Sequence, residues 1–198
     1  MNNKYDTILI ATKNKGKIKE FENMFKSFNI NIKTLYNYDL PEIEETGNSF
    51  FENALIKAKA GYDISNLPTI SDDSGLEVEA LNWKPGIHSA RFGKRSFNDQ
   101  DRMFYLLEKL KGKKNRNARF KTSLVFYNGE NQINKFEGIW KGIILKEPIG
   151  NNGFGYDPIF YDENLKLSAA QLSPDEKKLV SHRGKALKLF FEKFKSMI

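Results

Sequence analysis

Two adjacent carboxylates, Asp72 and Asp73, lie in the run Ser71-Asp72-Asp73-Ser74-Gly75, with apolar residues on both sides. Carboxylate oxygens suit Mg²⁺, which keeps several waters and usually also takes oxygens from a bound phosphate. The same run is typical of a turn, because Asp, Ser and Gly are all turn formers. We therefore expect an acidic turn between two short strands, residues 68–72 and 76–80, and a cation could bind at it.

A catalytic cation is fixed in place only if its oxygen ligands come from more than one segment. Glu44 and Glu45, in the acidic loop 41–47, offer the second segment. In the helix expected from the Ser49 cap to about residue 62, Asn53 and Lys57 are one turn apart and share a face. Lys57 could touch a phosphate oxygen or orient an attacking water, although an exposed surface lysine would have the same pattern.

A basic loop follows the first expected strand, residues 7–11, and precedes a helix whose apolar face begins at Ile18. The loop after a strand, at the N-terminus of a helix, is where α/β proteins most often bind phosphate. It lacks the two glycines that a Walker A sequence needs before its lysine, so a solvated basic turn is the alternative. Its residues are Thr12, Lys13, Asn14, Lys15, Gly16 and Lys17.

The C-terminal half offers groups that could recognise a nucleoside. Phe154 lies between two glycines, which leaves its ring able to lie flat on a base or sugar, although a lone Phe is more often part of a core. His182 and Arg183 open a helix, with Lys177 more than one turn upstream. These donors could bind phosphate or the edge of a base.

Composition narrows the protein class. The chain has 198 residues, a formal net charge of +7 and no cysteine, which excludes disulfides and thiolate metal sites. We expect a single domain over residues 1–198, a cytoplasmic location and no membrane span, since no apolar run approaches the ~20 residues that a span needs. The positive charge would suit a polyanion, but the Lys-rich and Asn-rich usage of an AT-rich genome explains it nearly as well.

Local patterns predict helices and strands in alternation, followed by a hairpin and more helix. Residues 118–127 and 133–140 alternate apolar and polar positions, with Asn128-Gly129 starting the connection. Asn98 or Asp99 can cap a helix, and Ser173-Pro174 is a strong helix start. The sheet should therefore be mixed and covered by helices.

Taken together and in order, six segments resemble the inosine triphosphate pyrophosphatase family, and they cover nearly the whole chain. The chain departs from the pattern of this family at two positions. It has Gln171 where family members commonly have Glu, and Trp83 where they often have a small residue. The six segments are residues 11–17, 44–58, 71–76, 85–92, 153–158 and 181–187.

The resemblance implies a two-lobed α/β fold on a long, curved mixed sheet flanked by helices, with the active site in the cleft between the lobes, and a homodimer. It implies Mg²⁺-dependent hydrolysis of ITP, dITP and XTP to the nucleoside monophosphate and pyrophosphate, which removes these nucleotides before they enter DNA or RNA. It also implies residue roles in catalysis: Asp73 as catalytic base and metal ligand, Glu44 as second metal ligand, and Lys57 as catalytic lysine. Residues 12–17 would form the triphosphate loop, and Ser74 would contact the nucleotide. The base pocket would consist of Phe154, Gly155, Tyr156, Asp157, Lys177, His182 and Arg183.

Two other functions are compatible with parts of the sequence. A nucleic-acid-binding module would use the charge and aromatics but leave Glu44 and Asp73 without a purpose, because carboxylates repel a phosphate backbone. A nucleotide hydrolase of the septum-inhibitor type would share the chemistry and differ in substrate. We expect purine nucleoside triphosphates as the ligand, and neither nucleic acid nor a membrane as a partner.

Overall fold

The computed structural model describes residues 5–26, 28, 30–38, 43–129 and 133–195. The described chain forms two compact units. Unit 1 comprises Met1–Asp73, Thr122–Gly138 and Arg183–Ile198, and unit 2 comprises Ser74–Lys121 and Ile139–His182. Pro41 and Glu42 of the acidic loop, and most of the connection after Gly129, lie outside the described residues.

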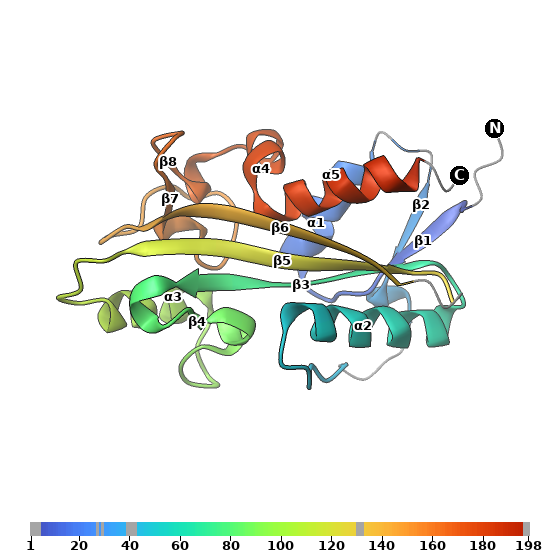
Figure 1. Ribbon diagram of the computed structural model, residues 1–198, viewed down its shortest axis with the longest axis horizontal. Coiled ribbons are helices and arrows are strands. Elements are labelled where there is room, and N and C mark those ends of the chain that lie inside the picture. The colour runs from blue at the N-terminus through green and yellow to red at the C-terminus, as the bar shows by residue number, and fades with distance from the viewer. Residues whose placement is uncertain (1–4, 27, 29, 39–42, 130–132, 196–198) are drawn as a thin grey trace. The chain divides into compact units, whose positions relative to one another are not determined.

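A mixed sheet runs through the chain, as the sequence predicts (Figure 1). Its strands are hydrogen-bonded in the order β2-β1-β3-β5-β6-β7-β8, and β4 pairs with β3. β1 is parallel to β2 and β3, whereas β7 is antiparallel to β6 and β8. The strands are β1 (Thr7–Ile10), β2 (Asn31–Thr34), β3 (Thr69–Val78), β4 (Lys84–Pro85), β5 (Asn117–Tyr127), β6 (Ile133–Ile144), β7 (Phe160–Asp162) and β8 (Leu167–Ser168).

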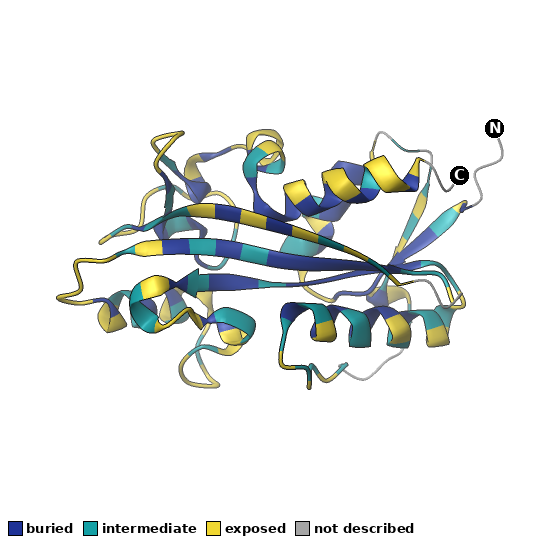
Figure 2. Ribbon diagram, in the orientation of Figure 1, coloured by how far each residue is buried: buried dark blue, intermediate teal, exposed yellow. Residues whose placement is uncertain are grey.

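The acidic run is part of a strand, so the prediction of a turn at residues 71–75 was wrong. β3 continues from Thr69 to Val78 without a break, and Figure 2 shows it buried over most of its length. Turn propensity is a local preference, and strand neighbours can override it when they satisfy the polar side chains. Ser71, for example, donates its hydroxyl hydrogen bond to the Ala54 carbonyl.

In unit 1, helices cover both faces of the sheet. α1 (Lys15–Phe25) and α5 (His182–Phe194) pack their apolar side chains with Ile8, Ile70 and Phe126 in one core cluster. α2 (Phe50–Ser65) packs Ala54 and Ala58 against Val125 in a separate cluster. A short 3-10 helix, Leu35–Asn37, follows β2.

α2 begins where the sequence predicts and runs three residues further than expected. The Ser49 side chain accepts a hydrogen bond from Glu52 N, which caps the helix start. The helix ends at Ser65, because Asn66 adopts a left-handed conformation with φ 52°. The helix therefore has 16 residues, and Asn53 and Lys57 are buried on one of its faces.

Unit 2 is built around an aromatic core. Phe120 and Trp140 pack with Phe160, and the Trp140 indole donates to Asp162 Oδ2 at 2.6 Å. α3 (Asp99–Lys109), capped by Asn98, adds Met103 and Leu106 to this core. The remaining elements are α4 (Pro174–Val180) and the 3-10 helices Glu79–Leu81, Gly86–Arg91, Asp157–Ile159 and Ala169–Gln171.

The C-terminal helical region is divided, with α4 ending at Val180 and α5 beginning at His182. Ser181 separates them in an extended conformation, ψ 157°. Ser173 caps α4 in a capping box with Glu176, as its sequence predicts. Among the helices that the structure describes, none is both long enough and apolar enough to cross a bilayer.

Candidate active site

The buried face of α2 connects the acidic loop with β3. Lys57 Nζ lies 2.6 Å from Glu45 Oε1 and 2.8 Å from the Asp72 carbonyl oxygen. Asn53, one turn earlier, donates from Nδ2 to Asp73 Oδ2 at 3.0 Å. The shared face predicted for these two side chains therefore brings both of them to the acidic residues of unit 1.

Asp72 is the centre of a buried ionic network. Its Oδ2 lies 3.1 Å from Lys17 Nζ and accepts hydrogen bonds of 3.1 Å from both Nε and Nη2 of Arg183. Arg183 Nη1 is paired with Glu20. Burial would raise the pKa of Asp72, but the positive charges of Lys17, Arg183 and Lys57 outweigh it and hold that pKa well below its ordinary value.

Asp73 is in a different electrostatic state from its neighbour. Asp73 is 5% exposed, and its burial raises the pKa of its carboxyl group. The positive charges of Lys57 and Lys17 and the Asn53 hydrogen bond act in the opposite direction but do not outweigh burial. A carboxylate with a raised pKa and nearby cations has the properties of a general base. The structure therefore distinguishes the two aspartates, which the sequence alone could not do.

The basic loop lies between β1 and α1, as predicted. Thr12 is buried, and its hydroxyl accepts a hydrogen bond from Asn14 N at 3.1 Å. Asn14 caps α1 by accepting from Lys17 N at 3.0 Å. Lys13 and Lys15 are exposed, whereas Lys17 turns inward to Asp72. The loop thus places a helix N-terminus and two exposed lysines in unit 1.

In unit 2, the Gly153–Asp157 segment is held by Asp157. Asp157 Oδ2 accepts from Phe154 N at 2.8 Å and from Lys177 Nζ at 2.6 Å. Gly153 has φ +77°, and a Cβ on it would collide with Asp157 Oδ2, so this tight approach requires glycine. Lys177 Nζ lies 4.9 Å from the centre of the Phe154 ring. The Phe154 ring is therefore held beside a buried Lys177–Asp157 ion pair.

Two further predicted residues in unit 2 have clear structural contacts. Tyr156 is buried and donates a hydrogen bond from its hydroxyl to the Ser89 carbonyl at 3.0 Å, which ties the segment to the 3-10 helix Gly86–Arg91. The His182 ring stacks on Phe120, with centroids 4.9 Å apart and planes 13° from parallel. Phe120 holds the His182 ring in place, a role that its position in an alternating strand did not indicate.

The predicted site residues divide between the units. The structure brings Lys17, Lys57 and Arg183 together with Asp72 and Asp73 in unit 1, and Phe154, Asp157 and Lys177 together in unit 2. Ser74 begins the first segment of unit 2, directly after Asp73. The prediction that Arg183 contacts a base stays a prediction, and in the structure its guanidinium binds Asp72 and Glu20.

Sequence reasoning missed Glu20 and Thr122. Glu20 lies in α1 and pairs with Arg183, and Thr122 Oγ1 lies 3.2 Å from the Asp73 carbonyl oxygen. Glu20 follows Lys17 by three positions, so a shared helix face was the available signal. Thr122 lies on a strand 49 positions from Asp73, and no local pattern links the two.

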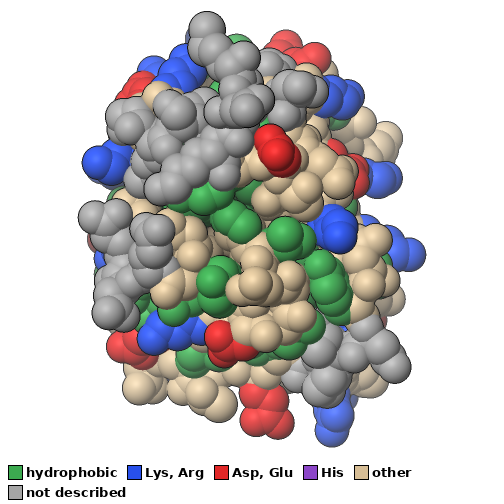
Figure 3. All heavy atoms as spheres, turned by 90° about the vertical axis from the view of Figure 1, so that its right-hand side faces the viewer, with side chains coloured by type: hydrophobic (Ala, Val, Ile, Leu, Met, Phe, Trp, Pro, Cys, Tyr) green, Lys and Arg blue, Asp and Glu red, His purple; other side chains and the backbone are tan. Residues whose placement is uncertain are grey.

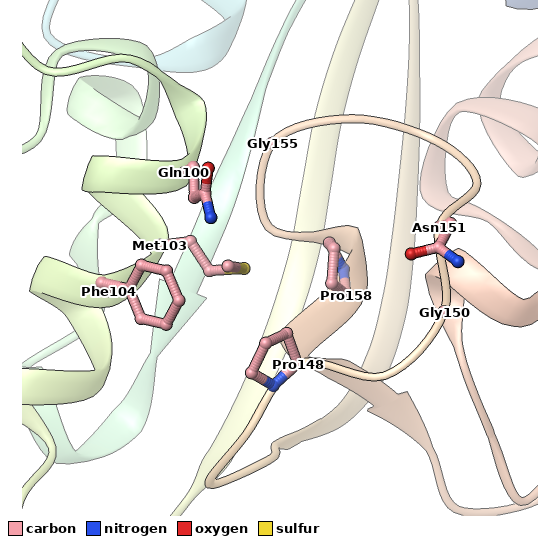
Figure 4. A pocket seen from close by; sticks show the side chains of 8 residues that line it. All are labelled: Gln100, Met103, Phe104, Pro148, Gly150, Asn151, Gly155 and Pro158. Carbon is pink, nitrogen blue, oxygen red and sulfur yellow. The ribbon is translucent and has the colours of Figure 1, made fainter.

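A hollow of roughly 350 Å³ lies within unit 2, between α3 and the 148–158 segment. In Figure 4, Met103 points from α3 toward the segment that carries Pro148 and Pro158. Gly155 is the one predicted site residue that lines it. The lining is formed by Gln100, Met103, Phe104, Pro148, Gly150, Asn151, Gly155 and Pro158.

Four carboxylates of unit 1 lie in two segments, at positions 44, 45, 72 and 73, and carboxylate oxygens are ligands that hard cations prefer. Within the described ranges, no cluster of three or more His, Cys, Asp or Glu side chains is close enough to hold a metal by itself. Glu45 and Asp72 are neutralised by Lys57, Lys17 and Arg183, whereas Glu44 is exposed. Mg²⁺ is usually bound by one or two protein carboxylates, and phosphate and water oxygens take its remaining coordination positions.

Comparison with known proteins identifies the family. A sequence model of the Ham1 family matches residues 8–193. The chain belongs to the Ham1 family. A dITP/XTP pyrophosphatase from Bacillus anthracis is 44% identical over 191 residues, covering 94% of this chain and 95% of that protein. The resemblance that the motifs indicate is therefore confirmed.

Solved structures of the Ham1 family agree in fold. A HAM1 protein from Coxiella burnetii superposes with a TM-score of 0.87 at 36% identity, over 96% of this chain and 98% of that one. The nucleoside-triphosphatase, or dITP/XTP pyrophosphatase, of Mycobacterium abscessus gives a TM-score of 0.74 at 41% identity, over 93% and 98%. The predicted class, a mixed α/β sheet flanked by helices, is confirmed.

Proposed function

We propose that this Ham1 protein hydrolyses ITP, dITP and XTP to the nucleoside monophosphate and pyrophosphate. The observation that carries the proposal is the contrast between Asp72 and Asp73 in one strand: Asp72 is neutralised by cations, and Asp73 is buried with a raised pKa beside Lys57. Removal of these nucleotides from the pool prevents their incorporation into DNA and RNA.

The phosphate chemistry is assigned to unit 1. Hydrolysis at the α-phosphate requires charge neutralisation on the phosphate oxygens and a water in line with the leaving pyrophosphate. Lys13, Lys15 and the N-terminus of α1 bind the triphosphate, and Lys57 orients the reacting groups. Asp73 accepts the proton of the attacking water, because its carboxyl group is buried and is oriented by the hydrogen bond from Asn53 Nδ2 at 3.0 Å.

The cofactor that we propose is Mg²⁺, with Glu44 and Asp73 as its protein ligands. The two carboxylates come from separate segments, and their neighbours Glu45 and Asp72 are already paired with lysine and arginine. A bound Mg²⁺ would neutralise charge on the phosphate oxygens and acidify water. The oxygen-only donor set and the absence of cysteine from the chain fit this hard cation.

Base recognition is assigned to unit 2. Phe154 provides a ring for stacking, while Lys177 and His182 provide donors. Hypoxanthine and xanthine carry an acceptor oxygen at the six position, where adenine carries an amino group. A buried donor left facing the amino group costs roughly 1–3 kcal/mol, so ATP is disfavoured. Ser74, Gly155, Tyr156 and Asp157 complete the proposed nucleoside contacts, and Arg183 remains a proposed base contact as well.

We also propose that the protein is a homodimer that acts in the cytoplasm. Light scattering on the purified protein measures the oligomeric state directly.

The Lys and Arg side chains visible on the face in Figure 3 stand mostly apart and are interspersed with Asp and Glu. Over its described residues, this face therefore shows no continuous basic patch of the kind that a nucleic-acid-binding module needs.

The test of the function is a panel of nucleoside triphosphates assayed with Mg²⁺, with pyrophosphate and orthophosphate scored separately. We expect ITP, dITP and XTP to release one pyrophosphate per nucleotide, with ATP and pyrimidine nucleotides turned over slowly. Chelation of the cation should stop turnover. Orthophosphate as the first product, or a preference for pyrimidine nucleotides, would assign the protein to another class of hydrolase.

A further inference from the structure

Asn53 is a fully buried polar residue in the first turn of α2, and its amide contacts two segments that carry proposed cation ligands. Its Oδ1 accepts a hydrogen bond from Gly47 N at 2.8 Å, in the loop of Glu44. Its Nδ2 donates to Asp73 Oδ2 at 3.0 Å. One side chain therefore connects the acidic loop with β3, entirely within unit 1.

The orientation of the Asn53 amide follows from its partners. A backbone N–H can only donate, so the amide oxygen must face Gly47. The amide nitrogen must then face Asp73, and the Oδ2 atom of Asp73 receives a hydrogen bond. The loop thus determines which group Asn53 offers to the proposed general base.

The loop approaches Asn53 more closely than a side chain at position 47 would permit. A Cβ on Gly47 would lie 2.8 Å from Asn53 Oδ1 and 2.6 Å from Glu52 Cβ. Lys57 makes a second connection of the same kind one turn along α2, between Glu45 and the Asp72 carbonyl. The helix face therefore joins the acidic loop to β3 at two successive points.

We infer that Asn53 is a positioning residue, whose amide orients the Asp73 carboxylate and fixes the backbone of the loop that carries Glu44. The inference rests on the proposed function, because it assigns the purpose of this amide to the two proposed cation ligands. Removing the amide leaves Lys13, Lys15, Lys57 and the base contacts in place. The loss therefore falls on the chemical step and on cation affinity, and substrate affinity changes little.

Two substitutions separate the two halves of the amide. Asn53→Ala removes both hydrogen bonds, and Asn53→Asp keeps an acceptor for Gly47 N while losing the donor to Asp73. We expect both variants to lose at least ~10-fold in kcat for ITP, with KM changed by less than about threefold, because misplaced reacting groups slow the chemical step. Wild-type kcat in either variant overturns the inference. A loss in Asn53→Asp with wild-type kcat in Asn53→Ala also overturns it, because the loss would then come from charge repulsion between Asp73 and the new carboxylate.

Glu52→Ala is the matched control. Glu52 neighbours Asn53 in the same helical turn and is exposed, and its Oε2 accepts a hydrogen bond of 2.6 Å from Asn48 N, directly after the acidic loop. A general loosening of the loop would therefore affect both positions. We expect Glu52→Ala to keep kcat within about twofold of wild type, since exposed substitutions cost little. An equal loss in Glu52→Ala would overturn a specific role for Asn53.

A second readout needs no turnover. Mn²⁺ binding to the nucleotide-free protein, followed by the electron paramagnetic resonance of free Mn²⁺, should weaken about tenfold in Asn53→Ala and remain unchanged in Glu52→Ala. Unchanged Mn²⁺ affinity in Asn53→Ala, or a wild-type protein that binds no Mn²⁺, overturns the inference. If Mn²⁺ affinity depends on Asn53 but no triphosphate is hydrolysed, the proposed function fails and the positioning role stands.

Thermal unfolding of each variant establishes whether it is folded. If Asn53→Ala does not fold, Asn53→Asp and Gly47→Ala carry the test. Gly47→Ala leaves Asn53 and Asp73 in the chain but pushes against the same amide from the loop. We expect Gly47→Ala also to lower kcat by at least ~10-fold at similar KM. A folded Gly47→Ala variant with wild-type kcat and wild-type Mn²⁺ affinity overturns the inference.

Discussion

Buried charge is arranged differently in the two units. Unit 1 gathers Lys17, Lys57 and Arg183 around two aspartates, so several unlike charges share one buried network. In unit 2 the proposed nucleoside surface contains one buried ion pair, Lys177 with Asp157, beside the Phe154 ring. Phosphate chemistry needs charged groups that are held in fixed positions, whereas a base needs a flat apolar surface and a few directed donors. The difference matches the roles that we assign to the units.

The largest expected effect is on stability in unit 1. Asp72→Asn removes the charge that compensates buried Lys17 and Arg183, and breaking such a pair costs about 3–5 kcal/mol. Urea unfolding measures the loss, and Asp63→Asn, an exposed position on α2, serves as the control. If Asp72→Asn is as stable as wild type, the network does not stabilise unit 1.

The pH dependence of the Asp72 contribution has a definite sign. The folded-state pKa of Asp72 is depressed, so its contribution is fully present above the unfolded value of 3.8 and is lost as the pH falls below it. The difference in unfolding free energy between wild type and Asp72→Asn should therefore be constant near pH 7 and shrink below about pH 4. A difference that does not change on acidification would exclude this charge as its cause.

The corresponding substitution at the next residue, Asp73→Asn, should affect activity. Asp73→Asn removes the proposed proton acceptor and a proposed cation ligand, and we expect a loss of at least ~100-fold in kcat for ITP with the fold retained. Steady-state kinetics at saturating Mg²⁺ measure the loss, and circular dichroism checks the fold. Full activity in this variant would remove Asp73 from the mechanism.

In unit 2, truncation of the stacking ring should weaken substrate binding. Phe154→Ala should raise KM for ITP by roughly tenfold with little change in kcat, because stacking on a base contributes about 1–3 kcal/mol and does not touch the reacting phosphate. Leu165→Ala, another partly exposed apolar side chain of unit 2, is the control. A fall in kcat at unchanged KM would place Phe154 nearer to the chemistry than we propose.

The smallest expected effect is a gain in stability from Asp73→Asn. The pKa of Asp73 is raised by burial, so the protonated carboxyl favours the folded state and its ionisation opposes folding. The contribution of the protonated carboxyl to stability is fully present below the unfolded pKa of 3.8 and is lost as the pH rises through the folded-state pKa. Without divalent cations, the variant should therefore have a higher Tm than wild type at pH 7 and an equal Tm below about pH 4. A lower Tm at pH 7 would contradict the burial effect.

The limits of inference from the sequence are clearest along β3. The polar run from Ser71 to Gly75 has the local preferences of a turn, yet it is strand throughout. β1 and β5 border this strand, and Ala54, Lys57 and Thr122 meet its polar groups. A partner 49 positions away, such as Thr122 for Asp73, leaves no signal in a local pattern. The turn prediction failed because hydrogen bonds from distant segments outweighed local preference.

The sequence by itself determined the elements whose causes are local: the Ser49 and Ser173 caps, and a start of α3 at Asn98 or Asp99, of which the structure has Asn98 as the cap. It also determined the family, through motifs whose residue types are fixed by their chemistry. Only the tertiary structure decided which aspartate is neutralised and which carries the raised pKa. The physical reason is that a pKa depends on burial and on neighbouring charges, and Arg183 reaches Asp72 from 111 positions away.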